Sequence, residues 1–336
     1  MWDRLKLLVR SVWLAVGRDS LSDQAGALTY YMILSAFPLL LAVVSLLSLL
    51  GIADTLVPAL ERLLESTMTT EVARFLAGLL HGFLTGSGAG WTLVLGVVVA
   101  TWSASKYVAA FGRAMNTVFG IGEGRPFLKL KGLQLLLTGG MIVTIIVALA
   151  AVMISDPVVK WLGETLGIGS ALTGVWSALR APLAVGLAIV VLAALYYITP
   201  NVRRTKRALL SPGAVIAILA VITVFWGFGL YLNVFDGASS YTKTYGALAG
   251  TVLVLFSMWL VNFVVLIGAE VDAQCERLRE LVAGRPADRG LLLPMRDDRG
   301  LRKRDARTEA LATASAEFRK RYSAAETEPD TAEPDA

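Results

Sequence analysis

The chain has 336 residues, of which 56% are hydrophobic and only 17% are charged. Its mean hydropathy of +0.65 is typical of a membrane protein and argues against an ordinary soluble domain. The net charge is +5, and the presence of one cysteine and one histidine excludes a disulfide framework or a thiolate metal cluster within a single chain.

The first element, residues 1–22, is predicted to be a cytoplasmic amphipathic helix. Apolar side chains recur at helical spacing over Trp2–Arg18, and the arginines fall on the other side. Tryptophan on the apolar face and arginine on the polar face favour a helix that lies in the lipid headgroup layer. The alternative is a helix packed on other cytoplasmic segments.

Residues 23–283 are predicted to form a membrane domain of six transmembrane helices. Each apolar run has about 20 residues or more, and about 20 helical residues cross a hydrocarbon core of roughly 30 Å. The runs are continuous rather than alternating, which excludes a β-barrel. The first run contains Pro38, which is expected to bend its helix. The predicted spans are 27–51, 91–112, 133–155, 176–198, 211–235 and 245–271.

Basic residues alternate between the segments that separate these spans. With Arg180, near the start of the fourth span, counted with the segment before it, the segments that precede the six spans contain, in turn, four, two, four, two, four and one Lys or Arg. This alternation follows the positive-inside rule and predicts that both termini are cytoplasmic. The basic surplus is thereby explained by topology and lipid contact, not by nucleic-acid binding. The long outer loops, 52–90 and 156–175, could roof a cavity or float at the interface.

The last segment, residues 284–336, differs in character from the rest of the chain. It carries eleven basic and eleven acidic residues and little apolar content. Such a composition buries too little apolar surface to fold alone. It predicts a charged, disordered cytoplasmic tail, with helix expected only around Ala306–Tyr322.

Polar residues within the apolar runs indicate the candidate site, because burying them in lipid is costly. Lys106 and Glu270 are both expected in the inner half of the bilayer, and we hypothesise that they pair or line one polar cavity. The alternative is that Lys106 extends to lipid phosphates and Glu270 lies at the water boundary. The candidate substrate path contains Tyr30, Ser35, Pro38, Ser103, Ser105, Lys106, Asn262 and Glu270.

No catalytic, cofactor-binding or metal-binding residue is assigned. The glycine cluster at 120–124 follows a membrane helix rather than a strand, so it is interpreted as a flexible loop and not as a nucleotide site. The cytoplasmic acidic residues are scattered, unlike the clustered ligands of metal-dependent hydrolases. The sequence therefore predicts a protein that is not an enzyme and needs no cofactor.

Three ordered motifs resemble the BrkB/YihY family of bacterial inner-membrane proteins, once mislabelled ribonuclease BN-like. They comprise Ala25-Gly26-Ala27-Leu28-Thr29-Tyr30-Tyr31 continuing to Pro38, Trp102-Ser103-Ala104-Ser105 with Asn116 beyond, and Tyr245-Gly246-Ala247-Leu248 continuing to Leu266-Ile267-Gly268-Ala269-Glu270-Val271-Asp272-Ala273. The similarity spans roughly residues 20–275. It implies six membrane helices with cytoplasmic ends in the bacterial inner membrane, but no settled activity. Roles proposed for the family include transport of envelope or lipid-linked molecules and resistance to serum killing.

The function favoured by these observations is transport, or assistance of transport, of an amphipathic envelope or lipid-like substrate. Membrane lipids are the expected partners. The alternative is a structural or assembly factor for envelope integrity that recruits partners through its tail. A nuclease rests only on the old family label.

Overall fold

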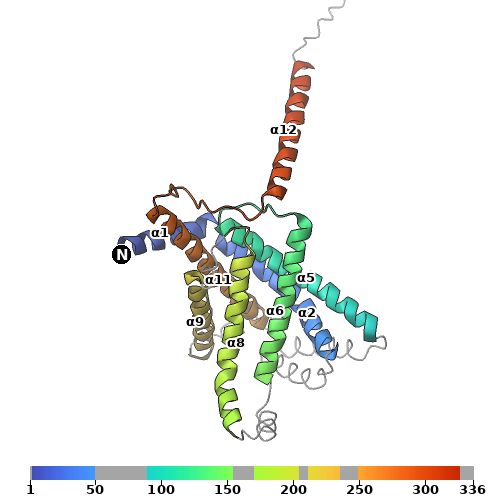
Figure 1. Cartoon of the computed structure of the whole chain (residues 1–336), viewed down its shortest axis with the longest axis vertical. Helices are drawn as coiled ribbons and strands as arrows, with labels where there is room; N and C mark the ends of the chain where they lie inside the picture. The colour runs from blue at the N-terminus through green and yellow to red at the C-terminus, as the bar shows by residue number, and fades with distance from the viewer. Residues whose placement is uncertain (1, 50–88, 154–169, 204–210, 235–248, 326–336) are drawn as a thin grey trace, which may run out of the picture.

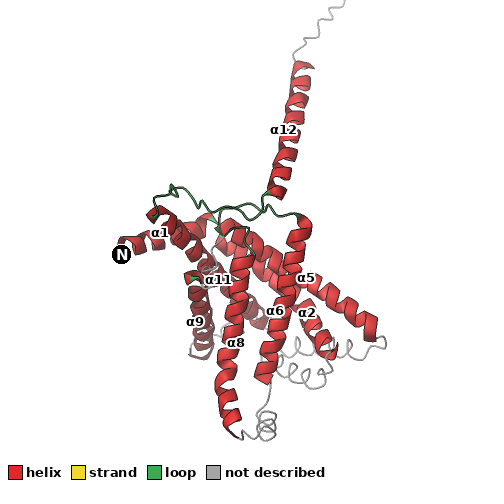
Figure 2. Ribbon diagram, viewed as in Figure 1, coloured by secondary structure: helices red, strands yellow, loops and turns green. Residues whose placement is uncertain are grey.

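The computed structural model describes residues 2–49, 89–153, 170–203, 211–234 and 249–325. Within these ranges the backbone is helical apart from short connections, and the one β feature is an isolated antiparallel bridge between Val202 and Met295 (Figure 2). The predicted all-α class is confirmed for this part of the chain. Most of the two predicted outer loops lies outside the described residues.

Six long helices occupy the positions of the predicted spans (Figure 1). They are α2 (Leu21–Leu49), α5 (Ala89–Val118), α6 (Phe127–Met153), α8 (Ser170–Ile198), α9 (Pro212–Val234) and α11 (Ala249–Val282). Over the described residues, three stretches are long and apolar enough to cross a bilayer, namely Phe127–Ala148, Gly174–Ile198 and Thr251–Val282. A shorter apolar stretch covers Pro212–Gly227.

The helices pack around a core at one end of the bundle. Helices α2 and α5 lie against each other, α11 contacts both α2 and α9, and α6 contacts α5 and α8. Fully buried side chains from four helices meet there, among them Leu21, Phe111, Tyr196 and Leu266. The rings of Phe111 and Tyr196 stack with centroids 6.2 Å apart, and the Tyr196 hydroxyl donates to the Val265 carbonyl. The ends of α5 and α8 and the latter part of α11 are thereby held together.

Two glycines allow α9 and α11 to approach closely. A Cβ atom added to Gly268 would lie 2.5 Å from the Gly213 carbonyl oxygen and 2.6 Å from the Ala217 Cβ, both shorter than real contacts. Asp272 strengthens the same contact by accepting a 2.7 Å hydrogen bond from the Gly213 amide. Gly268 lies within the third motif of the family resemblance, and its role there is to permit this packing.

The N-terminal helix α1 (Trp2–Arg18) forms where the amphipathic pattern predicts it. It packs against α11, with Ala15 buried, and it leaves most of its apolar face uncovered. Trp2 and Trp13 are 66% and 77% exposed, respectively. A left-handed residue, Ser20, then turns the chain into α2. These features fit a helix at a lipid surface, which stays a prediction.

The segment expected to be disordered has a defined backbone as far as Ala325. Residues 283–298 run along the end of the bundle and are bonded to the loop after α8. The Arg203 amide donates to the Pro294 carbonyl over 2.9 Å, and Arg296 Nε donates to the Val202 carbonyl over 2.7 Å. Helix α12 (Arg299–Ala325) then stands away from the bundle (Figure 1). Hydrogen bonds to the loop after α8 take the place of the apolar contacts that residues 283–298 lack. Helix α12 includes the expected helix Ala306–Tyr322, and the disorder of the tail stays a prediction. We call residues 119–126, 199–203 and 283–298 the collar.

Candidate functional site

Asn262 joins three helices inside the bundle. Its side chain is 1% exposed; Oδ1 accepts a 2.9 Å hydrogen bond from the Tyr107 hydroxyl of α5. Its Nδ2 donates to Thr29 Oγ1 of α2 over 3.2 Å and to the Met258 carbonyl over 3.0 Å. The predicted site residue Asn262 is therefore satisfied by protein groups, and it ties α2, α5 and α11 together.

Ser105 is also buried, and its hydroxyl oxygen accepts a hydrogen bond from a lysine ammonium. Lys131 Nζ of α6 donates to Ser105 Oγ over 2.6 Å, and the same ammonium lies 4.0 Å from the Trp102 ring centroid. Ser105 in turn donates to the Trp102 carbonyl over 2.6 Å. Lys131 therefore interacts with Ser105 and Trp102, although the sequence predicted that it lies in the loop before the span 133–155.

The remaining predicted residues of α2 and α5 are placed differently from one another. Tyr30 is 59% exposed and packs edge-on against Tyr31, whereas Ser35 is buried and its hydroxyl has no partner among the described residues. Ser103 is half-buried. Pro38 lies within α2, and the bend expected there stays a prediction.

Lys106 and Glu270 do not pair. The structure describes both residues: Lys106 is exposed on α5, whereas Glu270 is completely buried. Glu270 Oε1 accepts a 2.8 Å hydrogen bond from Gln274, and Oε2 has no partner within the described residues. The charged groups that act on Glu270 are Asp19 and Arg18, at the end of α1. Glu270 is therefore not paired with Lys106, and its side chain is buried where α1 packs against α11.

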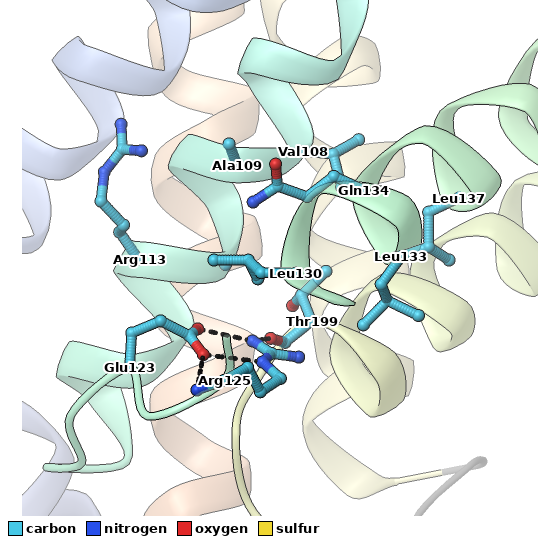
Figure 3. Close-up of a pocket in the computed structure, with 11 residues that line it drawn as sticks. Val108, Ala109, Arg113, Glu123, Arg125, Leu130, Leu133, Gln134, Leu137 and Thr199 are labelled. Carbon is cyan, nitrogen blue, oxygen red and sulfur yellow. Dashed lines mark hydrogen bonds and ion pairs between the residues drawn. The ribbon is translucent and has the colours of Figure 1, made fainter. Parts of the chain in front are cut away.

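A partly buried ion pair lies in the loop between α5 and α6 (Figure 3). Arg125 Nε and Nη2 donate to the two carboxylate oxygens of Glu123 over 2.7 and 2.6 Å. The same Nη2 donates to the Thr199 carbonyl over 2.7 Å, which fixes the loop after α8. Sequence reasoning interpreted residues 120–124 as a flexible loop and missed this pair, although an acid and a base two residues apart gave a local signal.

Asparagines connect this pair to the rest of the collar. Asn116 Nδ2 donates to Glu123 over 2.9 Å, and its Oδ1 accepts from the Asn201 amide over 2.8 Å. The fully buried Asn201 side chain bonds the Gly122 carbonyl and both the amide and the carbonyl of Asp297. The three parts of the collar are therefore one hydrogen-bonded unit.

Two collar carboxyls have lowered pKa values. For Glu123, burial alone would raise the pKa, but hydrogen bonds from Arg125 and Asn116 and the Arg125 charge outweigh it and hold the pKa below its ordinary value. Hydrogen bonds from Arg299, and then from Lys129, hold the pKa of Asp297 well below its usual range. Both groups are therefore anionic at neutral pH and committed to cations of the protein.

Two small cavities flank the end of α5 next to the collar. The first, about 150 Å³, lies between α5 and α6; its lining combines Arg113, Gln134 and the Glu123–Arg125 pair with leucines of α6 (Figure 3). The second, about 290 Å³, lies between α5 and α2, where Gln24, Ala27 and Leu28 form the α2 wall. Arg113 lines both cavities. Each cavity is thus mostly apolar with a few polar groups, as is usual for ligand sites.

Comparison with known proteins identifies the family. The family model described as "Virulence factor BrkB" matches residues 12–290, which is most of the chain. The chain belongs to the BrkB family. The match extends past the last predicted span to residue 290, so it includes both cavities and the Glu123–Arg125 pair but not Asp297.

The names of the relatives of this BrkB-family protein say little about what they do chemically. The chain is 26% identical over 260 residues to the "Putative ribonuclease-like protein YfkH" of Bacillus subtilis (strain 168), covering 77% of this chain and 91% of that protein. It is 27% identical over 278 residues to the "UPF0761 membrane protein XAC0937" of Xanthomonas axonopodis pv. citri, covering 80% of this chain. The chain spans 61% of the length of that relative and of a similar protein from Stenotrophomonas maltophilia. No solved structure matches. The protein is a multi-pass membrane protein of this family.

Proposed function

We propose that this BrkB-family protein moves, or helps to move, an amphipathic lipid-like molecule across or within the bacterial inner membrane. The observation that carries the proposal is the pair of cavities at the end of α5, where apolar walls adjoin Arg113. An apolar surface next to a cation complements a molecule with a hydrocarbon part and a polar or anionic head. The first cavity adjoins α6, whose residues Phe127–Ala148 are long and apolar enough to cross a membrane.

The proposal requires that the collar faces the cytoplasm. We infer six crossings with both ends inside, because six long helices occupy the predicted spans and basic residues are concentrated on alternate connections. Arg125, Lys129 and the four basic residues of 203–207 then lie on the cytoplasmic side with α1. In a Cys275→Ser background, a cysteine introduced at Ala306 should react with a membrane-impermeant maleimide only after the membrane is opened.

Reconstitution tests the movement of lipid. Purified full-length protein is placed in liposomes with a trace of phospholipid bearing a fluorescent head, and dithionite added outside bleaches the accessible label. A transporter should make the inner pool accessible within minutes, whereas protein-free liposomes should retain about half of the signal. Ala27, which is exposed in the second cavity, offers a blocking variant, Ala27→Leu, and exposed Ala178 on α8 offers the matched control Ala178→Leu. Retention of the inner signal with the wild-type protein would overturn the proposal.

Helix α12 favours a second candidate, a recruiting or assembly factor. Leu311, Phe318 and Tyr322 are 57–68% exposed and recur on one side of the helix, as in helices that bind partners. Truncation after Arg304 separates the two functions, since it spares the collar and the Arg304 bond to the Glu123 carbonyl. A transporter should keep its activity after this truncation, and a recruiting factor should lose it.

We also propose that the protein is not an enzyme. The carboxylate that lines the described cavities, Glu123, is bound by Arg125 and is unsuited to act as a base. Metal-dependent cleavage of RNA by pure protein, abolished by Glu123→Gln, would contradict this.

A further inference from the structure

The second cavity has an unusual electrostatic character. Its α5 wall is formed by Ala110, Arg113, Ala114 and Thr117, and its α2 wall has no charged group. Arg113 is exposed and forms no ion pair with any described residue. In Figure 3 its guanidinium points away from the Glu123–Arg125 pair and toward α2, where it lies 5.6 Å from the Tyr31 ring centroid. A cation in a cavity without a carboxylate favours an anion and disfavours a ligand whose head carries an amine.

The size of the cavity limits what it can hold. About 290 Å³ lies just below the range of roughly 300–1,000 Å³ for sites that hold whole small molecules. It is sufficient for the phosphate and glycerol part of a lipid, with the hydrocarbon part left outside. Arginine suits this ligand because its planar guanidinium binds two phosphate oxygens at once.

The helix faces beyond the cavity continue along the bundle. On α2, Tyr31 lies seven residues after Gln24 and therefore on nearly the same face, and Leu34, 47% exposed, follows it. On α5, Lys106 lies seven residues before Arg113, again on nearly the same face and about 10 Å farther along. Lys106 is exposed. The apolar α2 face is therefore placed to contact an acyl chain, and Lys106 of α5 is a second exposed cation farther from the collar.

We propose that the cavity between α2 and α5 binds the phosphate of an anionic phospholipid through Arg113, with the acyl chains along α2 and Lys106 as the next phosphate contact. This inference rests on the proposed function and names the class of its substrate. It also gives the exposed Lys106 a role other than the pairing with Glu270 that the structure contradicts.

Binding to the purified full-length protein in detergent tests the site. Native mass spectrometry counts bound molecules during titration with phosphatidylglycerol, with a diacylglycerol of the same chains and with glycerol 3-phosphate. We expect saturable binding of phosphatidylglycerol and little binding of the other two probes. Arg113→Gln should weaken phosphatidylglycerol binding about tenfold, because a hydrogen-bonded charge is lost, and Arg113→Lys should restore part of it. Lys106→Gln should have a smaller effect, and Arg180→Gln, an exposed arginine of α8, should have none.

Each contrary result has a defined meaning. Equal phosphatidylglycerol binding by wild type and Arg113→Gln, with both proteins folded by thermal unfolding, would overturn the site. Equal binding of glycerol 3-phosphate would identify a site for soluble phosphates instead of lipids. If Arg113→Gln loses binding while the wild type moves no lipid in liposomes, the site stands and the transport function fails. If the wild type moves lipid and Arg113→Gln binds normally, transport stands and this site fails.

Discussion

Asn262 should contribute measurably to stability through its two bonds to neighbouring helices. Hydrogen bonds between transmembrane helices average about 0.6 kcal/mol and reach about 1.7 kcal/mol. Tyr107→Phe removes one such bond, so we expect it to lower the free energy of unfolding by about 0.6–1.7 kcal/mol. Asn262→Leu, which keeps the number of side-chain heavy atoms, removes the bonds to Tyr107 and Thr29 and should cost about 1–3 kcal/mol.

A double-mutant cycle isolates the Tyr107–Asn262 bond. Unfolding of each variant is followed by tryptophan fluorescence in mixed micelles with increasing dodecyl sulfate. Tyr107→Phe should cost about 0.6–1.7 kcal/mol in the wild-type background and close to nothing after Asn262→Leu. Tyr30→Phe is the matched control, because that ring is exposed and the change should leave stability unaltered. Equal costs of Tyr107→Phe in the two backgrounds would refute the bond between α5 and α11.

Three further predictions concern packing and the collar. Gly268→Val should destabilise the protein by about 1–3 kcal/mol, since the added atoms meet the Gly213 backbone. Gly227→Ala on α9 should not destabilise it, because the space around Gly227 is open. Equal thermal unfolding of the two variants would argue against the close approach of α9 and α11. Asn201→Ala should free residues 283–298 from the loop after α8, seen as faster hydrogen exchange there, whereas exchange at wild-type rates would show that Asn201 does not fasten the collar. Because the pKa values of Glu123 and Asp297 are lowered by folding, their contribution is present above the ordinary carboxyl pKa of about 4 and is lost as pH falls below it. Hydrogen exchange of the collar, corrected for intrinsic rates, should therefore rise below about pH 4 and respond less in Asp297→Asn, and a pH-independent collar would contradict the assignment.

The helices could be predicted from the sequence because they depend on local patterns of apolar and polar residues. Continuous apolar runs and the amphipathic pattern of Trp2–Arg18 led to six long helices and α1 close to the expected bounds. Asn262 and Glu270 were recognisable as buried polar groups since they interrupt apolar runs. Helix α11 continues past the predicted end at residue 271 to Val282, because its charged last turns pack against the collar: Arg277 Nε donates to the Ala287 carbonyl over 2.9 Å.

Contacts between distant segments were harder to anticipate. Position along a helix gives depth in the membrane but not the direction in which a side chain points, so Lys106 and Glu270 had similar predicted depth and yet do not meet. The collar depends on Asn201 and on backbone groups of 283–298, whose hydrogen bonds leave no compositional signal. From the sequence, Arg113 contributes only to the count of basic residues that predicts the topology. Its position between two cavities depends on how α2, α5 and α6 pack together, which the sequence does not reveal.

An experimental structure of the protein in nanodiscs containing phosphatidylglycerol tests the central claim most directly. We predict elongated density between α2 and α5, with its head at Arg113 and its tail beside Tyr31 and Leu34. An empty groove, or lipid density confined to other faces of the bundle, would contradict the account.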